Sequence, residues 1–454
     1  MTLPSTARGR VASPLNDVRR LAVPAIAQQL LHTLVFLVDR ALLGHHDAAS
    51  LASMQISGPV VWSTTTILGA FTVGVVAVVG RRVGAGAHAE ASAALRASLG
   101  FGLLVGGVAL ALGLAGRGPL LGLFPAAGPA VWAEADAYLA VAFAAMPAML
   151  LSLTLAVAVQ AAGDTRTPFL VAAAGNAVNL ALSYLLVYGG LGVAPMGARG
   201  AALGSAAAFG LEALALLAFT GWRGAVISWR CPTGARLDSG DALRRVLRIA
   251  GPSLAERLVQ QTGFMTFVTL IGSLGATAMG ANQALIGLES VVFLSADGMG
   301  IATAAVVAQR LGAAAPGEAT EALRAGLGLA AGLLGAVGLL FVLVPEALLA
   351  PFTSDSELVR VAVPCMAVAA VAAPIMGAAV VASVALRGAG ATTSVLAVTF
   401  TGGLVVRLGA TYLLAFGLDL GLLGVWLGST ADWTVRALLF AVLIRRGGWR
   451  EIDL

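Results

Sequence analysis

Two stretches of the chain, RVGAGAHAEASAALRASLG (Arg82 to Gly100) and RLGAAAPGEATEALRAGLG (Arg310 to Gly328), are near copies of each other. At a fixed offset of 228 residues they are identical at 12 of 19 positions. The same offset relates Pro24 to Pro252, and an offset of 227 relates AVQAAGDT (158 to 165) to ALRGAGAT (385 to 392). The chain therefore contains two copies of one unit.

The composition predicts a membrane protein. The chain is 59% hydrophobic and only 11% charged, whereas about a quarter of the residues in a soluble domain are charged. Apolar runs of about 20 residues, the length that a helix needs to cross a bilayer, recur along the sequence. Few of them show the strict alternation of a barrel strand, so we expect helices. Twelve such runs can be counted: 21–44, 55–79, 95–115, 133–157, 168–189, 199–219, 250–274, 278–307, 323–344, 360–385, 394–416 and 421–444.

The spacing of the repeat predicts how the spans are arranged. Six spans separate the two copies, and an even number means that both copies insert with the same topology. The expected fold is an all-α polytopic membrane protein, with twelve transmembrane helices in two six-helix lobes related by a pseudo-twofold axis along the membrane normal. The predicted boundaries are 1–222 for the first lobe, 223–247 for a cytoplasmic linker and 248–454 for the second lobe.

The arginines predict the orientation. Arg8, Arg10, Arg19 and Arg20 precede an apolar run that is too long for the core of a cleaved signal, so we keep this run as the first span. Sixteen arginines between Arg81 and Arg450 fall on the same side as the amino terminus, against three on the other side, Arg117, Arg199 and Arg360. This asymmetry places both termini in the cytoplasm. The arginines are scattered over many loops, which argues against a nucleic-acid surface.

Several motifs, taken in order, resemble one transporter family. They are LAVPAIAQQ and VDRALLGH in the first span, VVGRRVGAG, QAAGDTRTP, GANQALIGLES, RGAGATT, and GLLGVWLGSTADWTVRALL followed by RRGGW. Together they resemble the multidrug and toxic compound extrusion family, and more narrowly its DinF-like branch. The resemblance implies a monomeric transporter of the plasma (inner) membrane, without a cofactor. Such a protein exports small amphipathic or cationic drugs and metabolites against an inward flow of protons or sodium ions.

Asp39 is the first candidate for ion coupling. An ionisable residue inside a span is costly and usually faces a cavity or a partner, and the resemblance implies that Asp39 is the coupling carboxylate of the first lobe. Burial favours the neutral form of a carboxyl group, which a proton carrier needs. Arg40 lies about 100° further around the helix, and we expect it to extend toward the outer headgroups. The alternative is a structural Asp39 paired with Arg40 or with a distant arginine.

Three polar residues of the fifth span share one helical face, because Asn176, Asn179 and Ser183 are spaced by three and then by four. The resemblance places them with Asp39 at the ion site. The family commonly has a second Asp where this chain has Ser183. With one carboxylate fewer, proton coupling is favoured over sodium, since a hard cation needs several oxygen ligands and compensating charge. Hydrogen bonding between helices is the alternative role of the two Asn side chains.

The second lobe carries its own candidates for an ion or substrate site. Another branch of the family places a coupling Glu in the seventh span near Gln260, and Glu256 lies one turn earlier on the same face. Alternatively, Glu256 pairs with an arginine of the linker. Glu289 matches a recurring position of the family, whereas Asp297 departs from its pattern. Asp297 is either a counter-charge for the substrate or a partner of Arg407.

Other charged and sulfur-containing residues have plainer interpretations. Asp432 and Arg436, spaced by four on the last span, are expected to pair in packing, and Arg407 can join them. The two cysteines, Cys231 and Cys365, indicate neither a disulfide nor a metal site. We expect the adjacent His45 and His46 to be solvated in an outer loop rather than to bind a metal.

Three other functions were weighed. The sequence has no phosphate-binding loop with Gly-Lys-Ser/Thr and no acidic metal cluster, which argues against ATP drive and against a membrane-embedded enzyme. A flippase for lipid-linked saccharides, or a polysaccharide exporter, would need a basic cavity, and Arg40, Arg257, Arg407 and Arg436 are few and dispersed. A major-facilitator fold would also have two six-span halves, but it fits the ordered motifs less well.

Overall fold

A computed structural model describes residues 13–125, 128–222, 224–230, 239–353 and 355–452. These residues form helices and loops, with one isolated bridge between Gly190 and Val193 and no strand among them. The predicted all-α class is confirmed. Arg8, Arg10 and Cys231 lie outside the described residues, as does the stretch 231–238 of the predicted linker.

The first half of the chain forms seven α-helices. They are α1 (Pro14–His46), α2 (Ala48–Leu68), α3 (Thr72–Gly84), α4 (His88–Leu121), α5 (Pro129–Ala161), α6 (Arg166–Tyr188) and α7 (Gly197–Thr220). A short 3-10 turn, η1 (Gly69–Phe71), joins α2 to α3, so that Ala48–Gly84 is one continuous span. The seven helices therefore make six spans.

The second half repeats this pattern. Its helices are α8 (Ser239–Gly272), α9 (Ala276–Gly312), α10 (Pro316–Leu343), the short α11 (Pro345–Leu349), α12 (Ser356–Gly388), α13 (Thr392–Thr399), α14 (Arg407–Tyr412) and α15 (Gly421–Arg446). A 3-10 turn, η5 (Gly448–Arg450), follows α15. Two π-helical segments, η3 (Phe400–Val406) and η4 (Leu413–Gly417), join α13 and α14 into one span, Thr392–Gly417.

Eleven helical segments of the described chain are long and apolar enough to cross a membrane. The twelfth predicted span is α8, which is as long but more polar because its first half carries Asp241, Arg244, Arg245 and Arg248. It begins at Ser239, inside the stretch 223–247 that the sequence analysis assigned to the linker. Most helices extend beyond the predicted apolar runs, since hydropathy detects only the part of a helix that lies in hydrocarbon.

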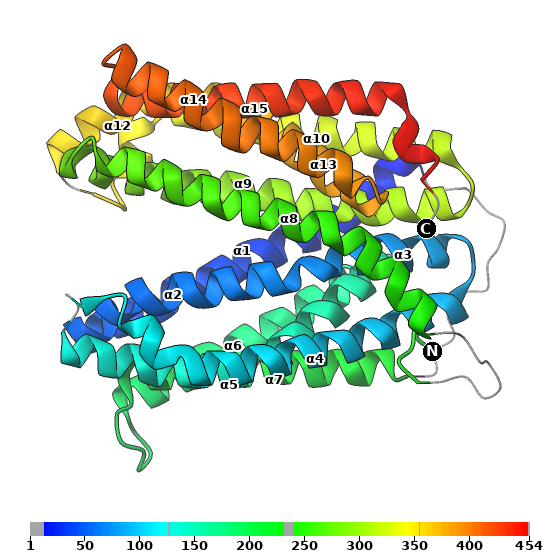
Figure 1. The fold of residues 1–454 in the computed structure, drawn as a ribbon, viewed down its shortest axis with the longest axis horizontal. Coiled ribbons are helices and arrows are strands. Elements are labelled where there is room, and N and C mark those ends of the chain that lie inside the picture. Colours follow the sequence, from blue (N-terminus) through cyan, green and yellow to red (C-terminus); the bar gives the residue numbers. More distant parts are fainter. Residues whose placement is uncertain (1–12, 126–127, 223, 231–238, 354, 453–454) are drawn as a thin grey trace.

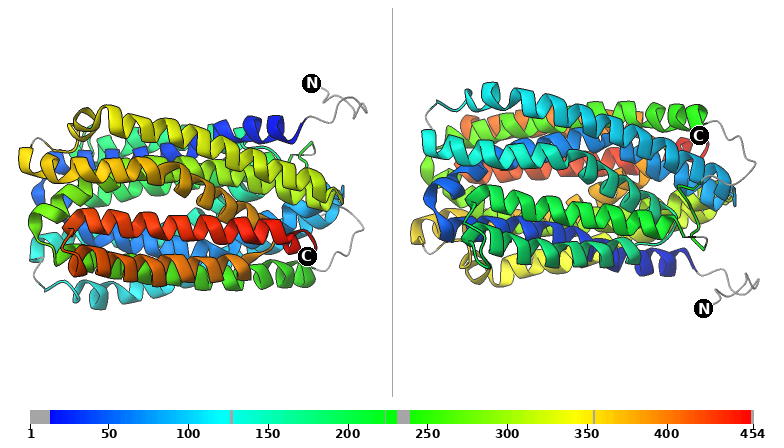
Figure 2. Two further views of the ribbon diagram at one scale, coloured as in Figure 1. Left: turned by 90° about the horizontal axis from the view of Figure 1, so that it is seen from above. Right: turned by 90° about the horizontal axis from the view of Figure 1, so that it is seen from below.

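The helices form two bundles that lie side by side, with α1–α7 in one and α8–α15 in the other (Figure 1). All long helices run roughly along the longest axis of the molecule, as views from two further sides also show (Figure 2). Both chain ends lie at the same end of the molecule, next to α3 (Figure 1). This arrangement agrees with the predicted two-lobe architecture.

The eleventh span departs from α-helical geometry where Arg436 packs against it. A Cβ atom added to Gly402 or Gly403 of η3 would overlap the Arg436 side chain. Glycine therefore permits the close approach, and the wider π-helical turn accommodates the large side chain. The segment brings α13, α14 and α15 together around a buried charge cluster.

The expected outer loop at His45 and His46 is not a loop. Both residues form the last turn of α1. The ring of His46 packs edge-on against Tyr188, with ring centroids 5.9 Å apart. This expectation was wrong because the apolar run ends before the helix does.

Candidate functional site

Asp39 lies in the last third of α1, on the side that faces α6 and α7. Its side chain is buried, with 3% of the residue exposed. The Ser205 hydroxyl on α7 donates a hydrogen bond to Asp39 Oδ2 at 3.1 Å. Asn179 Nδ2 on α6 donates in turn to Ser205 Oγ at 3.0 Å. Three helices of the first lobe thus converge on one carboxylate.

Ser183 completes the surroundings of the carboxylate. Ser183 and Asn179 are both buried and lie close enough to interact with Asp39. Gly204 of α7 makes this possible, because a Cβ atom at that position would overlap Ser183 Oγ and lie 2.9 Å from the Ser183 backbone nitrogen. The predicted shared face of α6 therefore does point at Asp39. Asn176 lies one turn away and is half-buried, with its Nδ2 atom buried and unpaired.

Two oxygen atoms of the site have no hydrogen-bond partner among the described residues. They are Asp39 Oδ1 and Asn179 Oδ1, and both are buried. A buried acceptor without a donor is costly. A proton on Asp39 or a bound cation would satisfy such oxygens, so the arrangement is suited to a reversibly bound positive charge.

The partners of Asp39 that can be named are neutral. The hydrogen bond to its Oδ2 comes from a serine, and Asn179 and Ser183 are uncharged. Arg40 is half-buried and lies near Tyr138 of α5. Sequence analysis missed Ser205, because a single serine in the Gly- and Ala-rich run GAALGSAAAFG shows no pattern that would single it out.

Glu256 of the second lobe has a charged partner instead. It is fully buried on α8, and its Oε1 atom accepts hydrogen bonds from Arg387 of α12 and Thr399 of α13, each at 3.1 Å. The alternative that Glu256 pairs with an arginine was right, but the partner is not in the linker. Arg387 is itself buried, at the cytoplasmic end predicted for its span. Gln260 lies one turn further along α8 and is half-buried.

Asp432 holds two arginines, as the spacing predicted. Arg436 Nε donates to Asp432 Oδ1 at 2.6 Å, and Arg407 Nε donates to Oδ2 at 2.8 Å. Both guanidinium groups also lie over the ring of Trp433, at 4.7 Å and 5.3 Å. Asp432 is fully buried, so this cluster is a packed, compensated ion-pair network.

Asp297 does not pair with Arg407. Its Oδ2 accepts a hydrogen bond from Gln29 of α1 at 2.6 Å, a contact that joins the two lobes. Asp297 and Glu256 both lie close enough to Arg257 to interact electrostatically. Glu289 lies near Arg407 and Asp432. The four predicted residues of the second lobe are thus not brought into one site: Glu256 and Asp297 flank Arg257, and Glu289 borders the Asp432 cluster.

The first lobe contains a second buried acid that sequence analysis did not discuss. Glu212 of α7 is 6% exposed, and its Oε2 accepts a hydrogen bond from Ser152 of α5 at 2.8 Å. Gly175 of α6 leaves room for it, since a Cβ atom there would lie 2.8 Å from Glu212 Oε1. Acid residues with neutral partners are therefore a feature of the first lobe.

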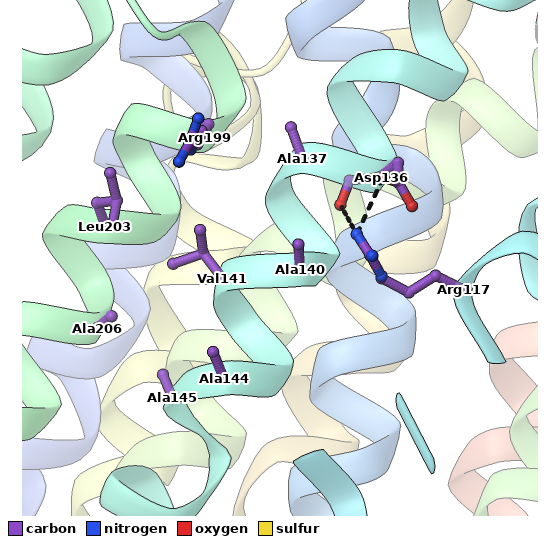
Figure 3. A pocket seen from close by; sticks show the side chains of 10 residues that line it. All are labelled: Arg117, Asp136, Ala137, Ala140, Val141, Ala144, Ala145, Arg199, Leu203 and Ala206. Atoms are coloured by element: carbon purple, nitrogen blue, oxygen red, sulfur yellow. Dashed lines mark hydrogen bonds and ion pairs between the residues drawn. The ribbon is translucent and has the colours of Figure 1, made fainter. Parts of the chain in front are cut away.

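A crevice of 520 Å³ lies between α5 and α7, away from these acids (Figure 3). Small apolar side chains, mainly alanines of α5, line it. At one side, Arg117 of α4 pairs with Asp136 at 2.9 Å (Figure 3). None of the predicted coupling residues lines this crevice.

Comparison with known proteins identifies the family. The sequence model of the family described as MatE matches residues 24–185 and 252–413. The two matched segments are offset by 228 residues at both ends, which is the offset of the internal repeat. The chain belongs to the MatE family, the multidrug and toxic compound extrusion transporters. It is a transporter and not an enzyme.

Curated relatives cover nearly the whole chain. A probable multidrug resistance protein NorM of Thermotoga maritima is 26% identical over 96% of this chain and 93% of its own length. The multidrug resistance protein MdtK of Edwardsiella ictaluri is 24% identical, with 94% of each chain covered. These relatives do not test the narrower DinF-like assignment, which stays a prediction.

Solved structures share the fold. A multidrug resistance MATE family transporter in an outward-facing conformation superposes with a TM-score of 0.90 at 20% identity, covering 99% of this chain and 100% of the other. A MOP superfamily transporter from Pyrococcus furiosus, described by a reverse polarity of its binding pocket, gives 0.88 at 20% identity, covering 97% and 98%. Both comparisons support the twelve-helix, two-lobe architecture.

Proposed function

We propose that this transporter exports amphipathic or cationic drugs and metabolites in exchange for protons, by alternating access of a site between the two lobes. The observation that carries the proposal is the state of Asp39. It is a buried carboxylate with a neutral hydrogen-bond donor on one oxygen and no partner on the other. Such a group can gain and lose a positive charge without breaking an ion pair.

A proton suits this site better than a sodium ion. Asp39 brings a single carboxylate, whereas a hard cation needs several oxygen ligands and compensating charge. Protonation would also turn Asp39 into a hydrogen-bond donor, in a site that contains the unpaired acceptor Asn179 Oδ1. Asn176, Asn179 and Ser183 are the residues that we propose act with Asp39.

The substrate class follows from the family and from the acids between the lobes. The relatives are named for multidrug resistance. Asp297 and Glu289 are half-buried on α9, and a cationic drug entering between the lobes would meet their charge. We propose Glu256, Gln260, Glu289 and Asp297 as the second-lobe residues that respond to ion or substrate.

The remaining features of the proposal concern the setting. Both termini lie in the cytoplasm, as the distribution of arginines predicts, and the protein works as a monomer in the plasma membrane. The lobes comprise residues 1–222 and 248–454. A flippase for lipid-linked saccharides would need basic side chains free for pyrophosphate, but Arg387, Arg407 and Arg436 each contact a carboxylate.

The test uses purified protein in liposomes loaded with a fluorescent lipophilic cation. A proton gradient and a sodium gradient are imposed separately, on wild type and on Asp39→Asn. We expect transport with the proton gradient only, and a loss of at least about 100-fold in the variant. Asp136→Asn, at the more exposed pair with Arg117, is the matched control and should transport normally. Transport that survives in Asp39→Asn would refute the role of Asp39, and sodium-driven transport would refute proton coupling.

A further inference from the structure

The first helix of each lobe packs into the core of the other lobe. The beginning of α1 contributes Val18, Leu21 and Ala22 to the apolar cluster of the second lobe. The beginning of α8 contributes Val246, Ile249 and Ala250 to an apolar cluster of the first lobe. Each residue of the second set follows its counterpart by 228 positions, the offset of the repeat. The two lobes therefore exchange equivalent surfaces.

The backbones of α3 and α9 touch at two equivalent glycines. A Cβ atom at Gly84 would overlap the carbonyl oxygen of Gln309 and lie 2.6 Å from its carbonyl carbon. A Cβ atom at Gly312 would overlap the carbonyl oxygen of Arg81 and lie 2.8 Å from its carbonyl carbon. Gly84 and Gly312 are repeat equivalents, and so are Arg81 and Gln309. This is a reciprocal contact of the kind that a twofold axis produces.

Side chains next to the glycines also cross between the lobes. Gln309 Nε2 donates to the carbonyl oxygen of Ala161, at the end of α5, at 2.7 Å. Arg81, its equivalent in the first lobe, donates to the carbonyl oxygen of Ala389, just past α12, at 3.3 Å, and to that of Ile452. Both donors therefore hold the last turn of the corresponding helix in the opposite lobe.

Ion pairs surround the crossing in the same pattern. Arg310 contacts Glu318 of its own lobe and Asp17 of α1, each at 2.6 Å. Arg82, the repeat equivalent of Arg310, contacts Glu90 at 2.9 Å and lies near Asp241 of α8. Each arginine thus faces an acid of its own lobe and an acid on the first helix of the other lobe.

All these contacts lie at the end of the molecule that carries both chain termini. The glycines are the last residues of α3 and α9, and Figure 1 shows the end of α3 beside both termini. A lobe that rocks relative to the other must separate here when this end opens. Direct contact between backbones leaves no flexible side chain to absorb an added atom, so the crossing is sensitive to a single methyl group.

We propose that Gly84 and Gly312 form a twofold-related lock that holds this end of the transporter closed, and that a side chain at either glycine shifts the protein toward the state in which this end is open. The inference rests on the alternating access of the proposed function. The two glycines are positioning residues, since they set the relative population of two arrangements of the lobes.

The test measures distances between spin labels at both ends in a chain whose native cysteines are replaced by Cys231→Ser and Cys365→Ala. His88→Cys with Pro316→Cys reports on the locked end, and Ala48→Cys with Ala276→Cys reports on the opposite end. All four positions are exposed, and each pair is made of repeat equivalents. The distances are measured in wild type, Gly84→Ala and Gly312→Ala, in lipid nanodiscs.

We expect either glycine variant to increase the population with the long 88–316 distance about tenfold, while the 48–276 distance shortens. The two variants should behave alike, because the contact is reciprocal. Gly100→Ala and Gly328→Ala are matched controls, also repeat equivalents, at which an added Cβ atom meets open space. They should leave both distances unchanged.

Gln309→Ala provides a second route, because it removes the hydrogen bond to Ala161 without adding atoms. It should move the distances in the same direction as the glycine variants. Unchanged distances in folded Gly84→Ala, Gly312→Ala and Gln309→Ala protein would overturn the lock, as would a shift in only one of the two glycine variants. The measurement needs no drug or ion gradient, so the lock can stand if drug export fails, and can fail if drug export stands.

Discussion

The two lobes derive from one repeated unit, yet they treat a buried carboxylate in opposite ways. In the first lobe, Asp39 accepts a hydrogen bond from the neutral Ser205. In the second lobe, Glu256 is bound by the guanidinium group of Arg387 and by Thr399. Both acids keep one buried oxygen without a partner. The lobes therefore differ mainly in whether the negative charge has a fixed positive neighbour.

This difference assigns different roles to the two halves. A carboxylate paired with a buried arginine stays ionised, because removing either charge leaves the other uncompensated in a medium of low dielectric constant. A carboxylate among hydroxyl and amide groups lacks this restraint. The first lobe is thus suited to exchange a proton, and the second lobe to remain electrically constant while the lobes move.

Glu256→Gln should cause the largest loss of stability. It leaves Arg387 buried without its counter-charge, which costs about 3 kcal/mol, whereas Asp39→Asn removes an uncompensated charge and should change stability by less than about 1 kcal/mol. Thermal unfolding in detergent, followed by intrinsic fluorescence, measures both variants. Equal losses in the two variants would contradict the comparison between the lobes.

Replacing both partners of the second-lobe pair should restore most of this loss. Glu256→Gln combined with Arg387→Met removes both charges and keeps similar volumes, so stability should return to within about 1 kcal/mol of wild type. The double-mutant cycle uses the same unfolding assay together with Arg387→Met alone. If the double variant is no more stable than Glu256→Gln, the arginine is not the partner that matters.

Ser205→Ala should weaken ion coupling without abolishing it. The variant removes the donor to Asp39 Oδ2 and leaves the carboxylate in place, a loss of about 1 kcal/mol for one hydrogen bond. We expect about a fivefold change in the proton concentration that half-saturates transport, measured in proteoliposomes. Thr430→Ala removes a hydroxyl that bonds only to its own helix and is the control. A normal proton dependence in Ser205→Ala would remove Ser205 from the site.

Glu212→Gln should have the smallest effect. Glutamine retains an oxygen that can accept the hydrogen bond from Ser152, and no charged partner is lost among the contacts described for Glu212. Stability should change by less than about 0.5 kcal/mol, and transport by less than about twofold. A strong loss of transport in folded protein would show that the first lobe uses two acids rather than one.

Much of the fold could be read from the sequence, because hydrophobic runs and repeats are local or periodic signals. The 228-residue offset predicted two equivalent lobes, and the spacing of Asn176, Asn179 and Ser183 placed them on one face of α6. The pair Asp432 and Arg436 was predictable for the same reason, since four residues make one helical turn.

Contacts between distant helices were not predictable in this way. Arg387 meets Glu256 across 131 residues, and Gln29 meets Asp297 across 268. Sequence analysis offered a linker arginine for Glu256 and Arg407 for Asp297, because neither the rotation of a helix about its axis nor the tilt between helices is encoded in spacing along one helix. Ser205 was missed for the same reason, since only the packing of α7 against α1 brings it to Asp39.

The sequence by itself determined the number of spans, the twofold repetition and the presence of an acid in the first span, since burial in lipid demands apolar helices and makes every charge conspicuous. The tertiary structure alone decided which charges are compensated. It also decided where the lobes touch, because contact between two backbones depends on the absence of a side chain at Gly84 and Gly312 and on the position of a helix that begins more than 200 residues away.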